Sequence, residues 1–326
     1  MSLDSDVIVD RRRLRRKLTF WRVVAALVAI AAVVVAGLVM TRSTPTGLAA
    51  AGSIARIKID GLIQSNSDRV EALDRLGKSS AAAVVVHINS PGGTTAGSEQ
   101  LYDALVRLKA KKPTVVVVEG LAASGAYIAA LASDHIVAQQ TSLVGSIGVL
   151  FQLPNFTGLL KTVGVQVEEV KSSPLKAAPN GYEPTSPEAR AALESLVKDS
   201  YAWFRNLVQT RRAMDDAQLD KVADGRVFTG RQAVDLKLID QLGDETTAVA
   251  WLVSAKNVKS DLPVRDFSLS PKFGDLTFLR AAAAITLDAV GLDAVARRVE
   301  QAGLAQAIDR LGLDGMLALW QPAATN

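Results

Sequence analysis

A serine followed by a glycine is the strongest chemical signal in this chain. Ser124 and Gly125 come after an apolar run at residues 114–118 and before a run of small residues at 127–132. A serine between a buried strand and the first turn of a helix can present its hydroxyl to a carbonyl carbon, while nearby backbone N–H groups hold the oxyanion. Because a lone Ser-Gly at a strand end is usually only a turn, this interpretation needs support from other residues.

A second glycine turn lies upstream. Asn89, Ser90, Pro91, Gly92 and Gly93 directly follow the apolar, valine-rich run at residues 82–88. Two such turns at the ends of neighbouring strands bring backbone amides close to a serine hydroxyl. The pair of turns therefore predicts a site for acyl transfer.

A serine nucleophile needs a general base, and histidine is the usual one. The chain has two histidines and no cysteine. His87 lies inside the expected strand, where we expect a neighbour to satisfy its ring, and His135 follows Asp134 between a helix and a strand. Either could serve only if the fold carried it to Ser124. Two separated histidines without cysteine do not form a metal-ligand set, and we expect no cofactor.

A lysine is then the remaining base for the serine. At its ordinary pKa of about 10.4 a lysine is protonated and cannot accept a proton. Burial disfavours the charged form and can lower that pKa by several units. A Ser/Lys pair therefore needs an amine in a partly dry pocket, oriented by a hydroxyl group. Composition alone does not select one lysine among the many.

Five short motifs in a fixed order carry a resemblance to a known family. The chain resembles the short form of signal peptide peptidase A, a serine peptidase of the Clp protease/crotonase superfold, over residues 54–253. Each motif is weak alone, but five ordered matches rarely arise by chance. They are Asn89-Ser-Pro-Gly-Gly93, Ala122-Ala-Ser-Gly125, Gly145-Ser-Ile-Gly148, Lys171-Ser-Ser-Pro-Leu-Lys176 and Asp224-Gly-Arg-Val-Phe-Thr-Gly-Arg231.

The resemblance implies a role for each matching residue. Ser124 would be the nucleophile, Lys176 the general base, and Ser146 the hydroxyl that orients the lysine. The amides of Gly93 and Gly125 would form the oxyanion hole, where one donor is worth about 3 kcal/mol of barrier. The resemblance supplies these roles; composition and spacing do not.

Two departures from the family pattern affect loop geometry. Ser173, followed by Pro174, stands where the lysine motif often has glycine, and Ala126 replaces a glycine that often follows the serine. For residues 224–231 we expect a helix-loop-helix connection that helps identify the family without supplying chemistry.

Alternating apolar and helical patterns predict the elements that position these residues. Short turns separate strand and helix patterns, which indicates an α/β fold, and the resemblance implies ββα repeats in a layered sheet with flanking helices. No internal repeat is visible. We expect strands at 54–59, 82–88, 114–118 and 136–138, and helices at 68–76, 99–108, 124–132 and 187–212, with residues 54–261 as the peptidase domain.

The N-terminal residues predict a membrane anchor. Residues 1–22 carry seven basic and three acidic side chains, an excess equal to the net charge of +4 of the whole chain. Residues 23–40 carry no charge and would span about 27 Å as a helix, close to the thickness of a bilayer core. We assign a cytoplasmic arm to 1–22, a transmembrane helix to 23–41 and a linker to 42–53. A cleaved signal peptide ending near residues 49–51 is the alternative.

The positive-inside rule leaves the arm in the cytoplasm and exports the rest of the chain. We therefore expect a single-pass protein of the bacterial inner membrane with an extracytoplasmic catalytic domain. The remainder of the chain is electrically neutral, so we expect no nucleic-acid partner. Residues 262–326, with alanine- and leucine-rich amphipathic segments, are expected to form a helical tail that packs beneath the domain, binds a partner, or enters the site as an internal substrate.

Three functions remain in competition. The favoured one is a membrane-tethered serine endopeptidase acting on cleaved signal peptides, whose small or aliphatic side chains suit the small residues around Ser124. The resemblance also implies a homo-oligomeric ring. The alternatives are a non-catalytic membrane scaffold on a protease-like fold and a crotonase-type acyl-CoA enzyme, the latter disfavoured by export and by the serine itself.

Overall fold

The computed structural model describes residues 21–22, 52–269 and the backbone of 317–319. The chain divides into two units, and residues 52–269 and 317–319 belong to one of them. The expected cytoplasmic arm and transmembrane helix, nearly all of the linker and most of the C-terminal tail lie outside the described residues. Within the described residues, no helix is long and apolar enough to cross a membrane.

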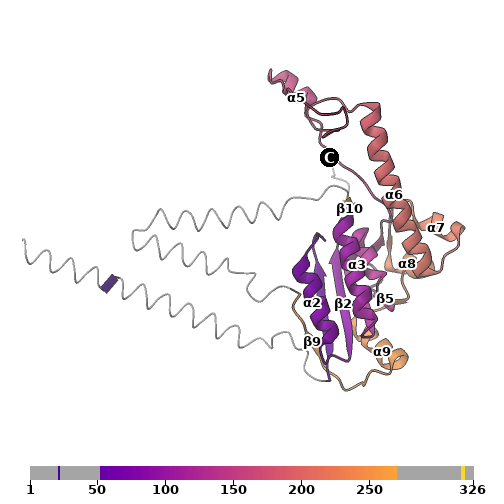
Figure 1. The fold of residues 1–326 in the computed structure, drawn as a ribbon. Coiled ribbons are helices and arrows are strands. Elements are labelled where there is room, and N and C mark those ends of the chain that lie inside the picture. Colours follow the sequence, from indigo (N-terminus) through magenta and orange to yellow (C-terminus); the bar gives the residue numbers. More distant parts are fainter. Residues whose placement is uncertain (1–20, 23–51, 270–316, 320–326) are drawn as a thin grey trace, which may run out of the picture. The chain divides into compact units, whose positions relative to one another are not determined.

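A mostly parallel sheet forms the centre of the described unit (Figure 1). Its main path runs β7-β6-β4-β2-β1-β9; β5 pairs with β4 and with β8, and only the β6–β7 pair is antiparallel. The strands are β1 (Ile54–Asp60), β2 (Ala83–Ser90), β4 (Thr114–Ala123), β5 (His135–Ala138), β6 (Leu143–Gly145), β7 (Val227–Thr229), β8 (Gln241–Leu242) and β9 (Val264–Asp266). The predicted α/β class is confirmed.

Strand β4 changes partner along its length. Its first half pairs with β5 from Val115 to Val118, and its second half pairs with β6 from Leu121 to Ala123. We expected this strand to end at Val118, because the apolar run ends there. It continues to Ala123 because β6 supplies a second partner, and this extension carries the chain directly to Ser124.

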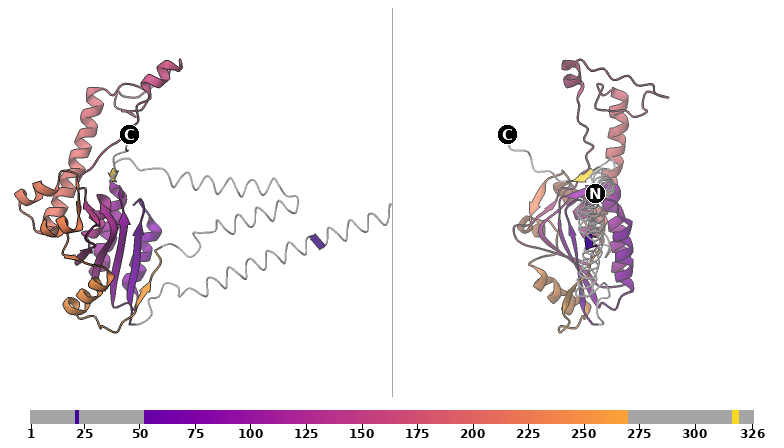
Figure 2. Two further views of the ribbon diagram at one scale, coloured as in Figure 1. Left: turned by 180° about the vertical axis from the view of Figure 1, so that it is seen from behind. Right: turned by 90° about the vertical axis from the view of Figure 1, so that its left-hand side faces the viewer.

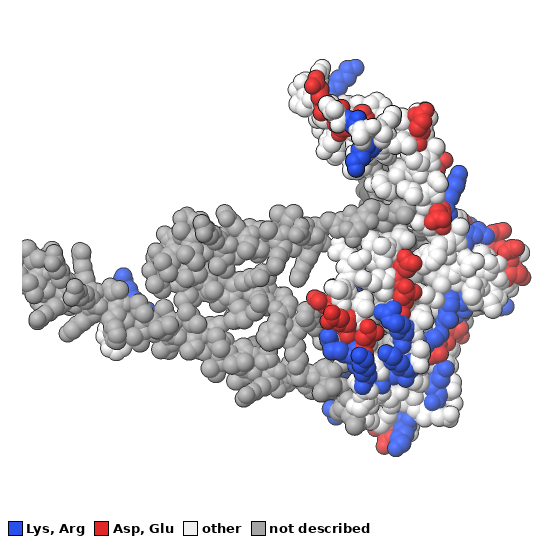
Figure 3. Space-filling model, viewed as in Figure 1, with Lys and Arg blue, Asp and Glu red and all other residues white. Residues whose placement is uncertain are grey.

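Helices cover both faces of the sheet (Figure 2). Strand residues alternate between faces: Val84, Val86 and Val116 pack under α2 (Ser67–Lys78), α3 (Thr95–Lys109) and α4 (Gly125–Ala130), whereas Val85 and Val115 pack under α9 (Glu245–Lys256). The continuous apolar runs in β2 and β4 follow from this double cover. On the outer surface of α2 and α3, acidic and basic side chains lie side by side (Figure 3), as in the Arg107–Asp74 ion pair.

The remaining helices are α5 (Thr157–Thr162), α6 (Pro187–Arg212), α7 (Asp216–Val222) and α8 (Gly230–Asp235). The bounds of α6 agree with the prediction, since Ser186 caps its N-terminus with Pro187 in the first turn. Residues 151–186, with α5 and the first half of α6, extend away from the sheet (Figure 1), and most of them are exposed. From here on, the arm means residues 151–186 and not the basic residues 1–22.

Two short strands replace part of the expected helical tail. Strand β9 pairs in parallel with β1, and β10 (Leu317–Leu319) pairs antiparallel with β3 (Gly92–Thr94). Their short, partly apolar sequences gave no helical or alternating period long enough to assign. These strands form because they pair with β1 and β3, which lie far away in the sequence.

A charged cluster ties the α9 side of the sheet together. Both ring nitrogens of His87 lie 2.6 Å from carboxylate oxygens, Nδ1 from Glu119 and Nε2 from Glu245. Arg56 donates two hydrogen bonds of 2.6 Å to Glu245 and one of 2.8 Å to Asp266. The expectation that a neighbour satisfies His87 is confirmed. Hydrogen bonding to Arg56, opposed by burial, lowers the pKa of Glu245 below its ordinary value.

Replacing Glu245 should therefore weaken the fold in a pH-dependent way. We expect Glu245→Gln to lower the free energy of unfolding by about 1–2 kcal/mol at pH 7, because it removes charge-assisted hydrogen bonds to Arg56 and His87. The lowered pKa makes this contribution present above the ordinary glutamate pKa of about 4.3, and lost as pH falls through the lower folded value. Urea unfolding from pH 7 down to pH 3.5 measures the difference.

Asp266→Asn is the matched control, because Asp266 also pairs with Arg56 but has a side chain that is 73% exposed. It should cost under about 1 kcal/mol. Equal losses for both variants, or a Glu245→Gln loss that grows toward acid pH, would contradict this interpretation.

Candidate active site

Ser124 occupies a strained turn between β4 and α4. Its φ of 55° and ψ of −117° are unusual for a residue with a side chain, and it is 1% exposed. Its N–H donates to the carbonyl of Gly145 at 2.7 Å, and its carbonyl accepts from the N–H groups of Tyr127 and Ile128 at 2.9 and 3.0 Å. These bonds hold the serine at a sharp strand-to-helix turn, the geometry in which a nucleophile is presented.

The Gly93 turn lies beside α4, because α4 contacts β3. Ile63 passes so close that a Cβ on Gly93 would be 1.8 Å from the Ile63 carbonyl oxygen, so only glycine fits. Ile63 donates to the Gly92 carbonyl and accepts from Thr94, each at 2.9 Å. Since backbone groups alternate along a strand, the amide of Gly93 points away from Ile63.

Gly125 supplies the second predicted oxyanion donor. It is the first residue of α4, and the first amides of a helix have no partner within the helix. The helix dipole also favours negative charge at this end. The structure therefore brings the β3 turn and the start of α4 together, as the two glycine turns predicted.

Ser146 lies on the other side of the Ser124 turn. It is 7% exposed with a φ of 51°, it follows Gly145, and its N–H donates to the carbonyl of Arg226 at 2.8 Å. Residues 224–231 connect α7 to α8, as the helix-loop-helix expectation has it, but the connection also contains β7, which pairs with β6. Only tertiary pairing creates this strand, and through it the motif holds the backbone of Ser146.

A hollow of about 390 Å³ opens next to these residues. Ser146, Ile147 and Gly148 form one wall, and Val197 and Tyr201 of α6 lie on another. The hydroxyl of Ser124 lies 3.4 Å from the carbonyl oxygen of Gly148, so the hollow adjoins the predicted nucleophile. Its lining is largely apolar, with Lys198 and Asp224 as its charged members.

Lys176 lies on the arm and is exposed. Its amine makes no hydrogen bond or ion pair with any residue of the described part, so the structure of one chain shows no contact between Lys176 and Ser124. The other lysine of the same motif is different: Lys171 Nζ lies 2.7 Å from Glu169 and 2.5 Å from Glu183. These carboxylates raise the pKa of Lys171, which keeps it protonated and unsuited to act as a base.

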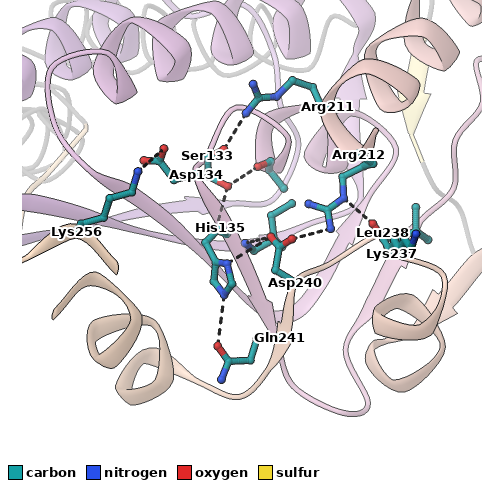
Figure 4. Close-up of polar contacts among 12 residues, drawn as sticks. Ser133, Asp134, His135, Arg211, Arg212, Lys237, Leu238, Asp240, Gln241 and Lys256 are labelled. Atoms are coloured by element: carbon teal, nitrogen blue, oxygen red, sulfur yellow. Dashed lines mark hydrogen bonds and ion pairs between the residues drawn. The ribbon is translucent and has the colours of Figure 1, made fainter. Parts of the chain in front are cut away.

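Neither histidine replaces the lysine. Both nitrogens of His87 are engaged by Glu119 and Glu245, as described above. His135 stacks on Trp251 with ring centroids 4.5 Å apart, and its nitrogens face Asp240 and Gln241 (Figure 4). Among residues 52–269 no cluster of ligating side chains could hold a metal ion.

A network behind α4 fixes the helix that carries Ser124. Arg211 of α6 donates to the carbonyls of Leu131 and Ser133 at 2.7 and 2.9 Å, at the C-terminal end of α4 (Figure 4). The hydroxyl of Tyr127, fully buried, donates to the carbonyl of Leu238 at 2.7 Å. No sequence pattern predicts either contact, since nothing in the sequence marks which arginine reaches α4.

The fold and the glycine turns indicate a class of protein. They describe an α/β fold with a buried serine at a strained turn, beside a glycine turn and the first residue of a helix, as in serine hydrolases. A family model described as Clp protease matches residues 63–142, and one described as Peptidase family S49 matches residues 106–259.

Curated relatives agree with this assignment. The chain is 34% identical over 221 residues to a putative protease of Synechocystis sp., covering 67% of this chain and 80% of the relative. It is 33% identical to a putative signal peptide peptidase SppA of Enterococcus faecium, over 54% of this chain and 51% of the relative. For Protease 4 of Haemophilus influenzae the identity is 31%, over 58% of this chain and 31% of the relative.

The chain belongs to peptidase family S49, the family of SppA-like serine peptidases. The resemblance drawn from the five motifs is confirmed, and so is the prediction of a peptide-bond hydrolase. The chain spans only about half of the Enterococcus relative and a third of the Haemophilus relative.

Replacing Arg211 tests whether its hydrogen bonds stabilise the end of α4. Arg211→Leu should lower the free energy of unfolding by about 1.5–3 kcal/mol, because two carbonyls lose a charged donor. Chemical unfolding followed by circular dichroism measures this loss. Arg205→Leu is the control on the same helix, since Arg205 makes a surface ion pair with the exposed Asp220 and should cost less than about 1 kcal/mol. A loss at Arg211 no larger than at Arg205 would contradict the role assigned to the network.

Proposed function

We propose that this chain is a membrane-tethered serine endopeptidase in which Ser124 is the nucleophile and Lys176 the general base. Ser146 orients the lysine, and the amides of Gly93 and Gly125 hold the oxyanion. The observation that carries the proposal is the strained, buried Ser124 at the junction of β4 and α4, beside the β3 turn.

The reaction follows from these positions. The neutral amine of Lys176 takes the proton from Ser124 Oγ as the oxygen attacks the peptide carbonyl carbon. The oxyanion accepts hydrogen bonds from the two amides, and the lysine returns the proton to the departing amine. Water then attacks the acyl-enzyme, and the lysine accepts a proton from that water. The lysine returns this proton to Ser124 Oγ as the bond to the acyl group breaks, which releases the acid product.

A second copy of the chain completes the site in this proposal. The arm carries Lys176 away from Ser124 of its own chain, and most exposed large apolar side chains of the described residues lie on the arm or at the start of α6. They are Leu153, Phe156, Leu159, Val163, Val165, Val167, Val170, Leu175, Tyr182 and Leu196. Such a surface marks a protein contact. Docking the arm on a neighbour's core would bury it and bring Lys176 to that neighbour's Ser124, in a homo-oligomeric ring.

Spent signal peptides are the proposed substrates. The hollow beside Ser124 is largely apolar, which suits the aliphatic side chains of such peptides. The uncharged residues 23–41 would keep the domain at the outer face of the bacterial inner membrane, where these peptides remain after cleavage. A relative named as a putative signal peptide peptidase supports the same substrate class.

The scaffold alternative predicts no chemistry at Ser124. It is disfavoured because serine, hydroxyl partner and lysine are all present at the matching positions. An acyl-CoA enzyme is disfavoured because a buried serine would lie where that chemistry needs none.

The two lysines of one motif provide a matched pair of variants. Lys176→Met should reduce kcat/KM for an apolar fluorogenic peptide by at least about 100-fold, the usual contribution of a general base. Lys171→Met should stay within about threefold of wild type, because Lys171 is held by Glu169 and Glu183. The measurement is peptide hydrolysis by the full chain in detergent, together with labelling of Ser124 by an acylating serine probe. Full activity in Lys176→Met, or equal losses in both variants, would exclude Lys176 as the base.

Mixing two inactive variants tests whether the site lies between copies. Ser124→Ala and Lys176→Met chains, co-expressed with different affinity tags, should regain about a quarter of wild-type activity, because random neighbours pair an intact serine with an intact lysine at that frequency. Tandem purification confirms that the assemblies are mixed. Mixed assemblies without activity would show that the lysine does not come from a neighbour.

A further inference from the structure

Strand β4 contains a bulge shortly before the predicted nucleophile. Its parallel pairing with β2 joins Ile88 to Val118 and, after an irregularity, Ser90 to Ala122. Over this stretch β2 advances by two residues and β4 by four, so β4 accommodates two extra residues within the segment 119–121. Bulges redirect a strand, and they occur often next to active sites.

The bulge sets how far along the sheet Ser124 lies. Without the two extra residues, Ser90 would face Gly120, and Ser124 would be carried about 6–7 Å further past the end of β2, at about 3.3 Å per residue. With the bulge, Ser124 is two residues past the partner of Ser90, and Gly92 is two residues past Ser90 itself. The bulge therefore brings the nucleophile level with the turn that contains the predicted oxyanion donor Gly93.

The hydroxyl of Ser142 lies directly against this bulge. Ser142 Oγ is 3.0 Å from the carbonyl oxygen of Val118 and 2.8 Å from that of Glu119, and the residue is 2% exposed. One hydroxyl proton is thus shared between two successive carbonyls. In the described strand pairs neither Glu119 nor Gly120 has a partner residue. Ser142 therefore supplies a donor where β4 has left β5 and has not yet joined β6.

The other contacts of the bulge are of a different kind. The carboxylate of Glu119 lies 2.6 Å from His87 Nδ1, which holds a side chain. Gly120 passes close to Asn89, since a Cβ on Gly120 would lie 3.2 Å from Asn89 Oδ1. Ser142 acts instead on the backbone carbonyls, and so on the path that the chain takes toward Ser124.

We propose that Ser142 is a positioning residue for the reaction at Ser124: its hydroxyl fixes the β4 bulge, and the bulge fixes the place of the nucleophile relative to the Gly93 turn. The inference rests on the proposed function and extends it to a residue that acts only through the backbone. A misplacement of about 1 Å can cost about 100-fold in rate, so a small relaxation of the bulge is enough to slow acylation.

Removing the hydroxyl tests this inference. In the full chain in detergent, Ser142→Ala should lower kcat for an apolar fluorogenic peptide by about tenfold or more and leave KM within about twofold, because the lost contact serves the geometry of the transition state. The rate at which an acylating serine probe labels Ser124 should fall by a similar factor. Ser142→Cys keeps the size of the side chain and a weaker donor, so it should show a smaller loss of kcat. It also provides a measurement in a variant whose packing is unchanged.

Thr114→Val is the matched control at the other end of the same strand. Thr114 is 1% exposed, and its hydroxyl also donates to a backbone carbonyl, that of Lys112 at 2.9 Å. Its kcat should stay within about twofold of wild type. Hydrolysis that depends on Ser124, with equal kcat in Ser142→Ala and Thr114→Val or with a loss confined to KM, would overturn the inference and leave the proposed function intact.

Hydrogen exchange separates the inference from the proposed chemistry. The amides of residues 119–123 should exchange at least about tenfold faster in Ser142→Ala than in Thr114→Val, because the bulge has lost the donor that holds it. Equal exchange in the two variants would overturn the role of Ser142. A wild-type chain without hydrolysis or labelling at Ser124 would refute the proposed function instead, and faster exchange in Ser142→Ala would then still support the hold of Ser142 on the bulge.

Discussion

The site depends on one backbone junction, the turn at which β4 becomes α4. Ser124 adopts a φ of 55° that a residue with a side chain does not favour, so neighbouring structure must hold it there. The carbonyl of Gly145 holds its amide, and the first turn of α4 holds its carbonyl. Behind the turn, Arg211 of α6 donates to the end of α4, and Tyr127 of α4 donates to Leu238, so that α4 is held by two distant parts of the chain.

The change of partner along β4 explains why the junction lies next to a hollow. If β4 paired with a single neighbour along its whole length, its end would be enclosed by that strand. Instead β5 stops beside Val118 and β6 begins beside Leu121, which leaves a step in the sheet. Residues 146–148, which follow β6, line the hollow, and the carbonyl of Arg226, just before β7, accepts the N–H of Ser146.

Nucleophile and proposed base are built on parts with opposite physical character. Ser124 lies in a rigid, buried junction, whereas Lys176 lies on an exposed arm with apolar side chains facing water. A base on such an arm gains a dry environment only when another surface covers it, which supports a site shared between copies. The same arrangement would make the proposed activity depend on assembly.

The sequence by itself determined the local features: the valine runs of β2 and β4, the bounds of α6 from Ser186 and Pro187, and the two glycine turns. These follow from short-range periodicity, capping and backbone freedom, which neighbouring residues dictate. The roles of Ser146 and Lys176 came from family resemblance rather than from such rules. Only tertiary structure decided the rest: the extension of β4 by β6, the strand hidden in residues 224–231, the link from Arg211 to α4 and the pairing of β10 with β3. Each joins segments distant along the chain, and short-range rules carry no information about which distant segments pack together.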